Sequence, residues 1–369
     1  MSHLDRVGAA SGVSRNVRVL ESYAATVRKK TFLLLVLAGC LVALAIVAAM
    51  VGKYHLSLPD VIRGLLGSAS ETVTVVLWNV RLPRIAAALA AGWALALSGT
   101  AMQSLLRNPL GSPSTLGISH GAAFGAAFAI VALGAGEIQS LRAGPAPSLS
   151  FSTVYSITGF AFLGSMLATA AIVLLARIRR MAPEAVILAG IALSSLFVSG
   201  TILLQYLASD TEVAAVVFWT FGDVARSSWH EIGITVVAAV LASIYFFWKR
   251  WNMNALSAGD DAASSLGVRV EGDRLLGMAV AASLAAFVTA FHGVIAFLGL
   301  LAPHIARRLV GTDHRFGLPG ACLIGAILLL LADTAGRLLV GSGALPVGVI
   351  TSFMGAPLFL YLLIGGKRS

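Results

Sequence analysis

Long runs without a charged residue constrain this chain more than any other feature of its sequence. Nine such runs, each 17 to 34 residues long, cover most of the 369 residues. Hydrophobic residues make up 58% of the chain and charged residues 11%, against roughly 25% charged residues in soluble domains. A soluble globular enzyme could not cover its surface with so few charges, and a disordered chain would contain more of them. The sequence therefore predicts an all-α polytopic membrane protein.

The lengths of these runs predict about ten transmembrane helices, because one crossing needs about 20 apolar residues. Most runs fit a single span, but residues 275–306 are too many for one, and we divide them at Gly293. The predicted helices are 32–51, 82–106, 114–133, 152–176, 184–207, 229–248, 274–292, 294–309, 318–338 and 346–364.

The placement of lysine and arginine predicts the orientation of these helices. With ten spans both termini lie on one side, and the segments on that side hold 19 of the 26 lysines and arginines. Positive charge concentrates on the cytoplasmic side of membrane proteins, so both termini are predicted to be cytoplasmic. Residues 1–31 then form a cytoplasmic basic tail, residues 32–366 form the membrane domain, and 249–274 is its longest cytoplasmic loop. That loop could hold a short helix at the membrane face or be a solvated loop.

A faint internal repeat supports a transporter. A shift of 190 residues aligns Arg84 with Arg274, Pro113 with Pro303 and Gly121 with Gly311. The shift equals five predicted spans, an odd number, so the two halves would be inverted in the membrane, as in many transporters.

Ionisable residues within the predicted spans are few. Asp333 and Arg337 lie four residues apart, which favours a structural ion pair on one helix face. An ion-driven carrier would normally have carboxylates at mid-membrane, so their scarcity disfavours that class. His120 and His292 are more readily interpreted as hydrogen-bonded side chains than as metal ligands. The sequence has no P-loop, no nucleophile–base pair and no metal-ligand cluster, so neither an enzyme nor a cofactor site is predicted.

An ordered set of short motifs resembles the FecCD-type permeases, the membrane subunits of prokaryotic importers for iron-siderophores, haem and cobalamin. RLPR (81–84), LSGTAMQ (97–103), NPLGSP (108–113) and LGISHGAAFG (116–125) come first. GDDAASSLG (259–267), GVIAFLGLLAPHIARRLVGTDHR (293–315), LLLLAD (328–333) and LPVGVITSFMGAPLFLYLL (345–363) follow. The resemblance covers nearly all of 32–366.

This resemblance implies a multi-pass subunit of the prokaryotic cytoplasmic membrane. It implies a second permease subunit, with a homodimer expected, two cytoplasmic ATPase subunits and an extracytoplasmic substrate-binding protein. ATP and Mg²⁺ would be bound by the ATPases and no cofactor by this chain; no nucleic acid is expected.

The resemblance also assigns roles to residues. Those implied are Arg81, Arg84 and Arg337 for binding-protein docking; Gly259, Asp260, Ala263, Leu266 and Gly267 for ATPase coupling; Asn108, Leu110, Pro183 and Glu184 for the cytoplasmic gate; and Ser194, Ser195 and Ser199 for the translocation pathway.

The predicted function is ATP-driven import of a metal chelate, with an iron-siderophore as the expected cargo. Cobalamin or haem import remains an alternative, followed by an ion-coupled secondary carrier.

Overall fold

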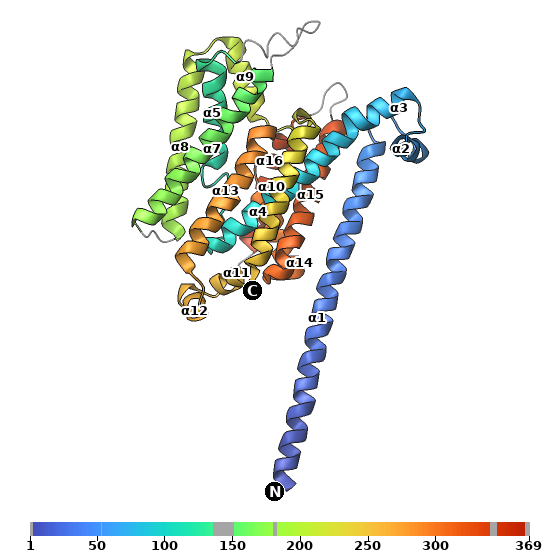
Figure 1. Ribbon diagram of the computed structural model, residues 1–369, viewed down its shortest axis with the longest axis vertical. Helices are drawn as coiled ribbons and strands as arrows, with labels where there is room; N and C mark the ends of the chain where they lie inside the picture. Colours follow the sequence, from blue (N-terminus) through green and yellow to red (C-terminus); the bar gives the residue numbers. More distant parts are fainter. Residues whose placement is uncertain (1–2, 53, 136–150, 180–182, 340–344, 366–369) are drawn as a thin grey trace.

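The computed structural model describes residues 3–52, 54–135, 151–179, 183–339 and 345–365. Within these residues every regular element is helical (Figure 1), as predicted. Each of the ten predicted ranges is occupied by a helix. These helices are α1 (His3–Met50), α4 (Leu82–Leu105), α5 (Ile118–Ala132), α7 (Phe151–Arg179), α8 (Pro183–Leu207), α10 (Trp229–Trp248), α13 (Val270–His292), α14 (Leu298–Val310), α15 (His314–Leu339) and α16 (Val347–Gly365).

Seven helical segments of the described chain are long and apolar enough to cross a membrane. They fall in α1, α3 to α4, α7, α8, α10, α13 and α15, and two shorter apolar helices are Ile118–Ala132 and Val347–Tyr361. The polytopic helical class predicted from the charge-free runs is therefore confirmed.

Helix α1 differs from the expected tail followed by a span. It is a continuous helix of 48 residues from His3, about 70 Å long at 1.5 Å per residue. No proline interrupts residues 3–31, so nothing in the local sequence forces a break before the apolar part. The basic half of α1 extends well beyond the lower end of the bundle in Figure 1.

Several short helices lie between the long ones, and of these only a short helix within the loop 249–274 was considered from the sequence. They are α2 (Leu58–Leu65), α3 (Glu71–Val75), a π-helical turn η1 (Val76–Arg81), α9 (Asp210–Thr220), a 3₁₀ turn η3 (Val224–Arg226), α11 (Arg250–Ser257) and α12 (Asp260–Ser265). The starts of α2, α9 and α10 are capping boxes, in which Ser57, Ser209 and Ser228 pair with an acidic residue three positions later. This spacing is visible in the sequence and would have located α2 and α9.

The predicted division at Gly293 is confirmed. Helix α13 ends at His292, and Gly293 has φ +77°, a conformation that favours glycine. The next helix, α14, begins at Leu298 rather than at 294, since Phe297 also has a left-handed backbone, φ +63°. Five residues of irregular backbone, 293–297, thus lie inside the bundle.

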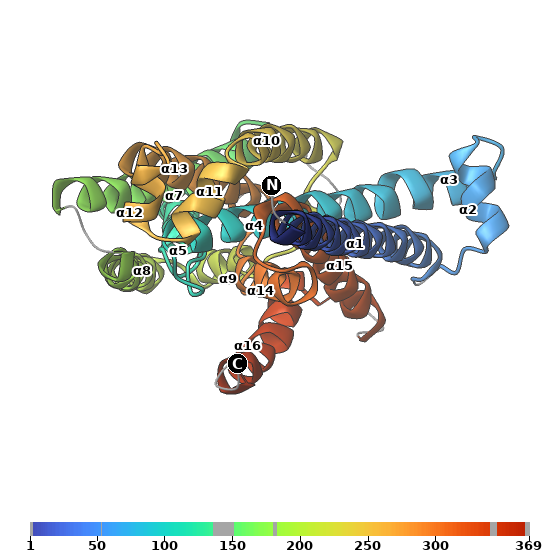
Figure 2. The same ribbon diagram turned by 90° about the horizontal axis from the view of Figure 1, so that it is seen from below.

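Helix α4 runs through the middle of the bundle, whereas α8 and α16 lie at its margin (Figure 2). Nearly every residue of α4 from Ile85 onward is buried. Glycines permit close helix contacts: a Cβ on Gly92 would collide with the backbone of Gly325, and one on Gly99 with that of Gly299. Helix α8 instead exposes large apolar side chains.

The glycines of the GISHGAAFG segment (117–125) permit a second close contact, between α5 and α7. Gly121 and Gly125 both lie against the backbone of α7, and Gly121 faces Gly164 so closely that neither has room for a Cβ. Helices α5 and α7 are held together by close van der Waals packing, because small residues let their backbones approach each other.

Candidate functional site

Helix α1 ends at the upper end of the bundle in Figure 1. Asp333, near the C-terminal end of α15, is the centre of a charged cluster that reaches this end of α1. Its side chain is fully buried in α15. The Arg84 Nε of α4 donates to Oδ1 at 2.6 Å, and the Arg337 Nε lies 3.2 Å from Oδ2. The predicted Asp333–Arg337 ion pair is therefore confirmed, and Arg84 is a second partner from another helix.

Arg81 and Arg337 cap the end of α1. The last carbonyl groups of a helix lack partners within the helix, and the last turn of α1 contains no basic residue of its own. Arg337 Nη1 donates to the carbonyls of Ala48 and Val51 at 3.3 and 3.2 Å. Arg81, which the π-helical turn carries, donates to the carbonyls of Ala49 and Tyr54. A positive charge at this position also complements the helix dipole.

The cluster extends to the segment after α9, which the sequence did not single out. Asp223 Oδ1 lies 3.7 Å from Arg84 Nη2. Arg226 donates to the carbonyls of Phe218, Trp219 and Phe221 and so caps α9. The three arginines predicted for docking thus lie at one end of the bundle, but each is mostly buried and already paired within the chain.

The opposite end of the bundle carries charges that are more exposed. Asp260, the first residue of α12, pairs with Arg274 at 2.9 Å and with Arg107 at 3.5 Å. Ala263 is buried and anchors α12, whereas Leu266 at its end is 72% exposed. Gly259 and Gly267 flank the helix with φ of +122° and +82°, where other residues would be strained. The short helix that was one of two readings of this loop is therefore observed.

A second group of charges supports α11. Asp313 accepts hydrogen bonds from Arg315 Nε at 2.8 Å and Asn254 Nδ2 at 3.1 Å. Burial acts to raise the pKa of Asp313, but the hydrogen bonds from Arg315 and Asn254 outweigh it and hold the pKa at about 2. Lys249 and Asn252 likewise bind Asp273, at 2.7 and 2.5 Å. Both carboxylates fix α11 to the helices that follow it.

The residues predicted for the gate lie near this end. Asn108 Oδ1 accepts from the Leu110 amide at 2.9 Å, which closes the turn after α4. Asn108 and Pro109 line a cavity of about 260 Å³, together with Gln103, Ser104 and Arg307. Pro183 begins α8, but its side chain and that of Glu184 lie outside the described residues.

Gln103 explains how a proline fits in α14. Pro303 has no N–H and leaves the carbonyl of Gly299 without its usual partner. Gln103 Nε2 donates to the carbonyls of Gly299 and Leu300, at 3.3 and 3.4 Å. The α4–α14 contact thereby compensates the broken helical bond.

The serines predicted for the pathway lie on α8. The Oγ atoms of Ser194 and Ser195 donate to carbonyls one turn earlier, at 2.8 and 3.2 Å. Ser199 is exposed. The structure therefore leaves α8 with an open surface on which Ser195 and Ser199 lie.

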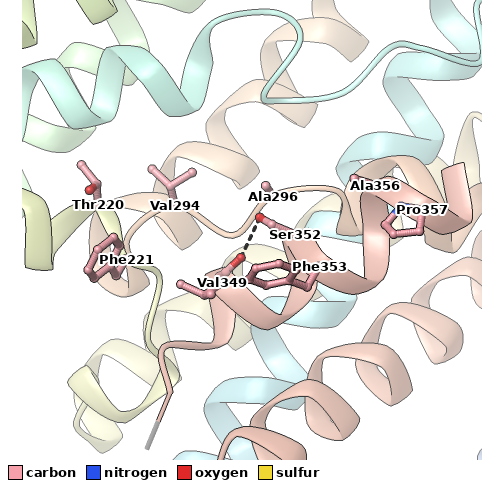
Figure 3. A pocket seen from close by; sticks show the side chains of 10 residues that line it. Thr220, Phe221, Val294, Ala296, Val349, Ser352, Phe353, Ala356 and Pro357 are labelled. Atoms are coloured by element: carbon pink, nitrogen blue, oxygen red, sulfur yellow. Dashed lines mark hydrogen bonds between the residues drawn. The ribbon is translucent and has the colours of Figure 1, made fainter. Parts of the chain in front are cut away.

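An apolar pocket of about 500 Å³ lies beside the irregular segment after Gly293 (Figure 3). Its walls come from the end of α9, from Val294 and Ala296, and from Val349, Ser352 and Phe353 of α16. Ser352 Oγ donates within its own helix, to the carbonyl of Gly348 at 2.8 Å. This pocket was not predicted, because its residues come from three separate segments that meet only on folding and no motif marks them.

His292 is fully buried, and its Nδ1 lies 2.9 Å from Ser227 Oγ. The hydrogen-bonded interpretation of this residue is therefore confirmed. Among the described residues, no three His, Cys, Asp or Glu side chains are grouped as a metal site would require.

Multiple apolar helices and an interrupted helix inside the bundle define a polytopic membrane protein, and interrupted helices are typical of transporters. Residues 40–365 match the model of the FecCD transport family, and the chain belongs to that family. It is therefore a permease subunit of a prokaryotic ABC importer, a multi-pass membrane protein and not itself an enzyme.

Relatives in sequence and structure agree with this assignment. The chain is 47% identical to an ABC transporter permease protein of Methanocaldococcus jannaschii over 93% of this chain and 97% of the relative. It is 36% identical to the hemin transport system permease protein HmuU of Yersinia pestis, over 88% and 92%. A solved structure described as an inward-facing conformation of a metal-chelate type ABC transporter superposes with a TM-score of 0.76 at 32% identity, covering 91% of this chain and 99% of that one.

Proposed function

We propose that this chain forms the membrane passage of an ATP-driven importer that moves a metal chelate inward, with an iron-siderophore as the cargo. The similarity to a metal-chelate type transporter over 91% of the chain carries this proposal. Relatives named for ferric citrate and siderophore transport favour iron chelates. Relatives named for hemin and cobalamin make haem and cobalamin the alternatives.

The proposed topology has ten spans and cytoplasmic termini. Residues 32–366 form the membrane domain, and the two halves of it are related as an inverted repeat. The excess of basic residues on the terminal side supports this orientation. Helices α5, α14 and α16 are short for a crossing, but they pack among longer helices, where shorter or broken spans are tolerated.

The proposed assembly has two copies of this chain, two cytoplasmic ATPases and one extracytoplasmic binding protein. The ATPases bind ATP and Mg²⁺, and this chain binds no cofactor. The open apolar surface of α8, with Leu188, Leu196 and Tyr206 between 66% and 85% exposed, supports a second copy packed beside it. Ser194, Ser195 and Ser199 would then face the passage between the copies, and Asn108, Leu110, Pro183 and Glu184 would form its cytoplasmic gate.

Coupling to the ATPases is assigned to α12 and its flanking glycines. The exposed Leu266 would enter a cleft of the ATPase, while Ala263 and the Asp260–Arg274 pair hold α12 on the permease. This ion pair connects α12 to the start of α13. A displacement of α12 by the ATPase would therefore also displace α13. Closure of the ATPases would thus move the two halves as rigid bodies and change which end of the passage is open.

Docking of the binding protein is assigned to the end that carries Arg81, Arg84 and Arg337. With Arg226, four arginines and two aspartates leave two positive charges in excess there, which suits acidic residues on a partner. An incoming carboxylate would compete with Asp333 for Arg84 and Arg337. Replacing Asp333 by Asn should therefore tighten docking if the arginines contact the partner directly, and leave it unchanged if they only support the surface.

The test is ATP hydrolysis by the chain reconstituted in nanodiscs with its partner ATPase. Candidate binding proteins are added with iron-siderophore, haem or cobalamin in turn. Stimulation by one loaded binding protein, lost in Arg84→Glu and in Leu266→Asp, would support the importer and identify the cargo. Stimulation by haem or cobalamin alone would replace the siderophore. If no cargo changes the rate and no ATPase associates, the coupling assignment fails, and uptake driven by an ion gradient becomes the next test.

A further inference from the structure

A large apolar groove lies between α1, α4, α10 and α15. It encloses about 1080 Å³, more than the roughly 300–1,000 Å³ of ordinary small-molecule pockets. Leu41 of α1, Leu89 and Trp93 of α4, Ile244 of α10 and Leu323 of α15 line it. Its main polar groups are already paired, because Trp93 Nε1 donates to Ser243 Oγ at 3.0 Å. An occupant of this groove must be long and apolar.

One end of the groove is basic. Arg250, the first residue of α11, lines it beside Phe247 and Trp248. Its guanidinium carbon lies 4.3 Å from the centre of the Phe247 ring. Within the described chain, Nη1 is the guanidinium nitrogen that donates a hydrogen bond, to the Phe247 carbonyl at 2.6 Å. Among the described residues Arg250 has no carboxylate partner. The remaining N–H groups can therefore receive a phosphate, for which the fork of arginine is well suited.

Further cations and aromatic rings surround the same end. Arg315 lies 5.1 Å from the ring centre of Trp251, the neighbour of Arg250. Lys30 of α1 lies 5.4 Å from the ring of Phe316, two residues before Leu318 of the groove wall. Asp313 neutralises Arg315, whereas Lys30 has no acidic partner among the described residues. Aromatic rings and basic side chains at the end of an apolar surface are typical of the level of lipid headgroups.

We infer that this groove binds one anionic phospholipid, with its acyl chains between α1 and α10 and its phosphate at Arg250. The occupant is a lipid rather than a soluble anion, because the apolar walls continue directly from the basic end. A second groove on α10 provides a comparison. It is lined by Gly233, Leu241 and Phe287, among others, and its walls contain no lysine or arginine. That groove should accept acyl chains without preference for the headgroup.

The test is native mass spectrometry of the full chain in detergent, titrated with phosphatidylglycerol or phosphatidylcholine of identical acyl chains. We expect the first lipid to bind about fivefold more tightly as phosphatidylglycerol, the factor expected for one basic side chain. Arg250→Gln should abolish this preference and Arg250→Lys should keep most of it. Equal binding of the two lipids by the unmodified chain would overturn the proposal.

Two matched tryptophan variants test the site itself. Ile244 and Leu241 are both exposed, at 62% and 63%, on the same helix, but they line different grooves. Ile244→Trp should displace the selectively bound phosphatidylglycerol, and Leu241→Trp should leave it bound. The reverse result, or loss in both variants while each still elutes as a folded protein, would contradict the assignment to this groove.

Discussion

The two ends of this bundle use the same chemistry, arginine against aspartate, for different purposes. At the upper end Asp333 is fully buried between Arg84 and Arg337, and Arg81 and Arg337 close the end of α1. At the lower end Asp260 is 38% exposed, and its partners Arg274 and Arg107 are 21% and 36% exposed. A buried charge must be paired or it destabilises the fold, whereas an exposed pair contributes little. The upper cluster therefore holds helices together, and the lower one leaves a surface free for contact.

The largest effect is expected from removing the buried charge. Asp333→Asn leaves Arg84 and Arg337 without their common partner, and we expect it to lower the free energy of unfolding by about 3–5 kcal/mol. Thermal unfolding in detergent measures this loss. Asp223→Asn is the control, since Asp223 is 30% exposed and 3.7 Å from Arg84. An equal loss in both variants would mean that burial does not distinguish the two carboxylates.

The next effect concerns the cap on α1. Arg81→Gln keeps a hydrogen-bond donor but removes the positive charge from the end of the helix, and we expect a loss of about 1–2 kcal/mol. Cleavage of α1 by a protease after mild heating would report its detachment from the bundle. Arg63→Gln is the matched control, because Arg63 lies at an exposed position on α2. If both variants detach α1 equally, the capping explanation is wrong.

The exposed pair should matter less. Asp260→Asn removes the pairing with Arg274 and Arg107, and we expect a change of about 0.2–1 kcal/mol that shrinks further in high salt. A double-mutant cycle with Arg274→Gln isolates the interaction. A coupling energy as large as that of Asp333 with Arg84 would remove the contrast between the two ends.

The smallest effect on stability is expected at Leu266. Leu266→Asp places a charge on a side chain that is already 72% exposed, so unfolding should change by less than about 0.5 kcal/mol. Stimulated ATP hydrolysis should nevertheless be lost, because an apolar contact with the ATPase is replaced by a carboxylate. Ser265→Asp, one residue earlier and also exposed, is the control. A normal rate in Leu266→Asp would argue against the coupling role of α12.

The sequence predicted the long elements well. Apolar runs fix where helices form, because a backbone without water must satisfy its hydrogen bonds within each segment. For that reason all ten predicted ranges contain helices, and Gly293 was correctly taken as a break. Apart from the short helix considered for the loop 249–274, the short helices were missed because they carry no long apolar run. The unbroken course of α1 was missed because a basic composition was read as a tail.

The sequence by itself determined the helical membrane class, the interrupted span and the Asp333–Arg337 pair, since each depends on residues close together in the chain. Only the tertiary structure decided that Arg84 shares Asp333, that Arg81 closes α1, and that Val294 and Phe353 line one pocket. For the two arginines, these contacts join residues 249 and 32 positions apart. Side chains so far apart in the chain meet only when helices pack, and packing is set by the shapes of whole helix faces.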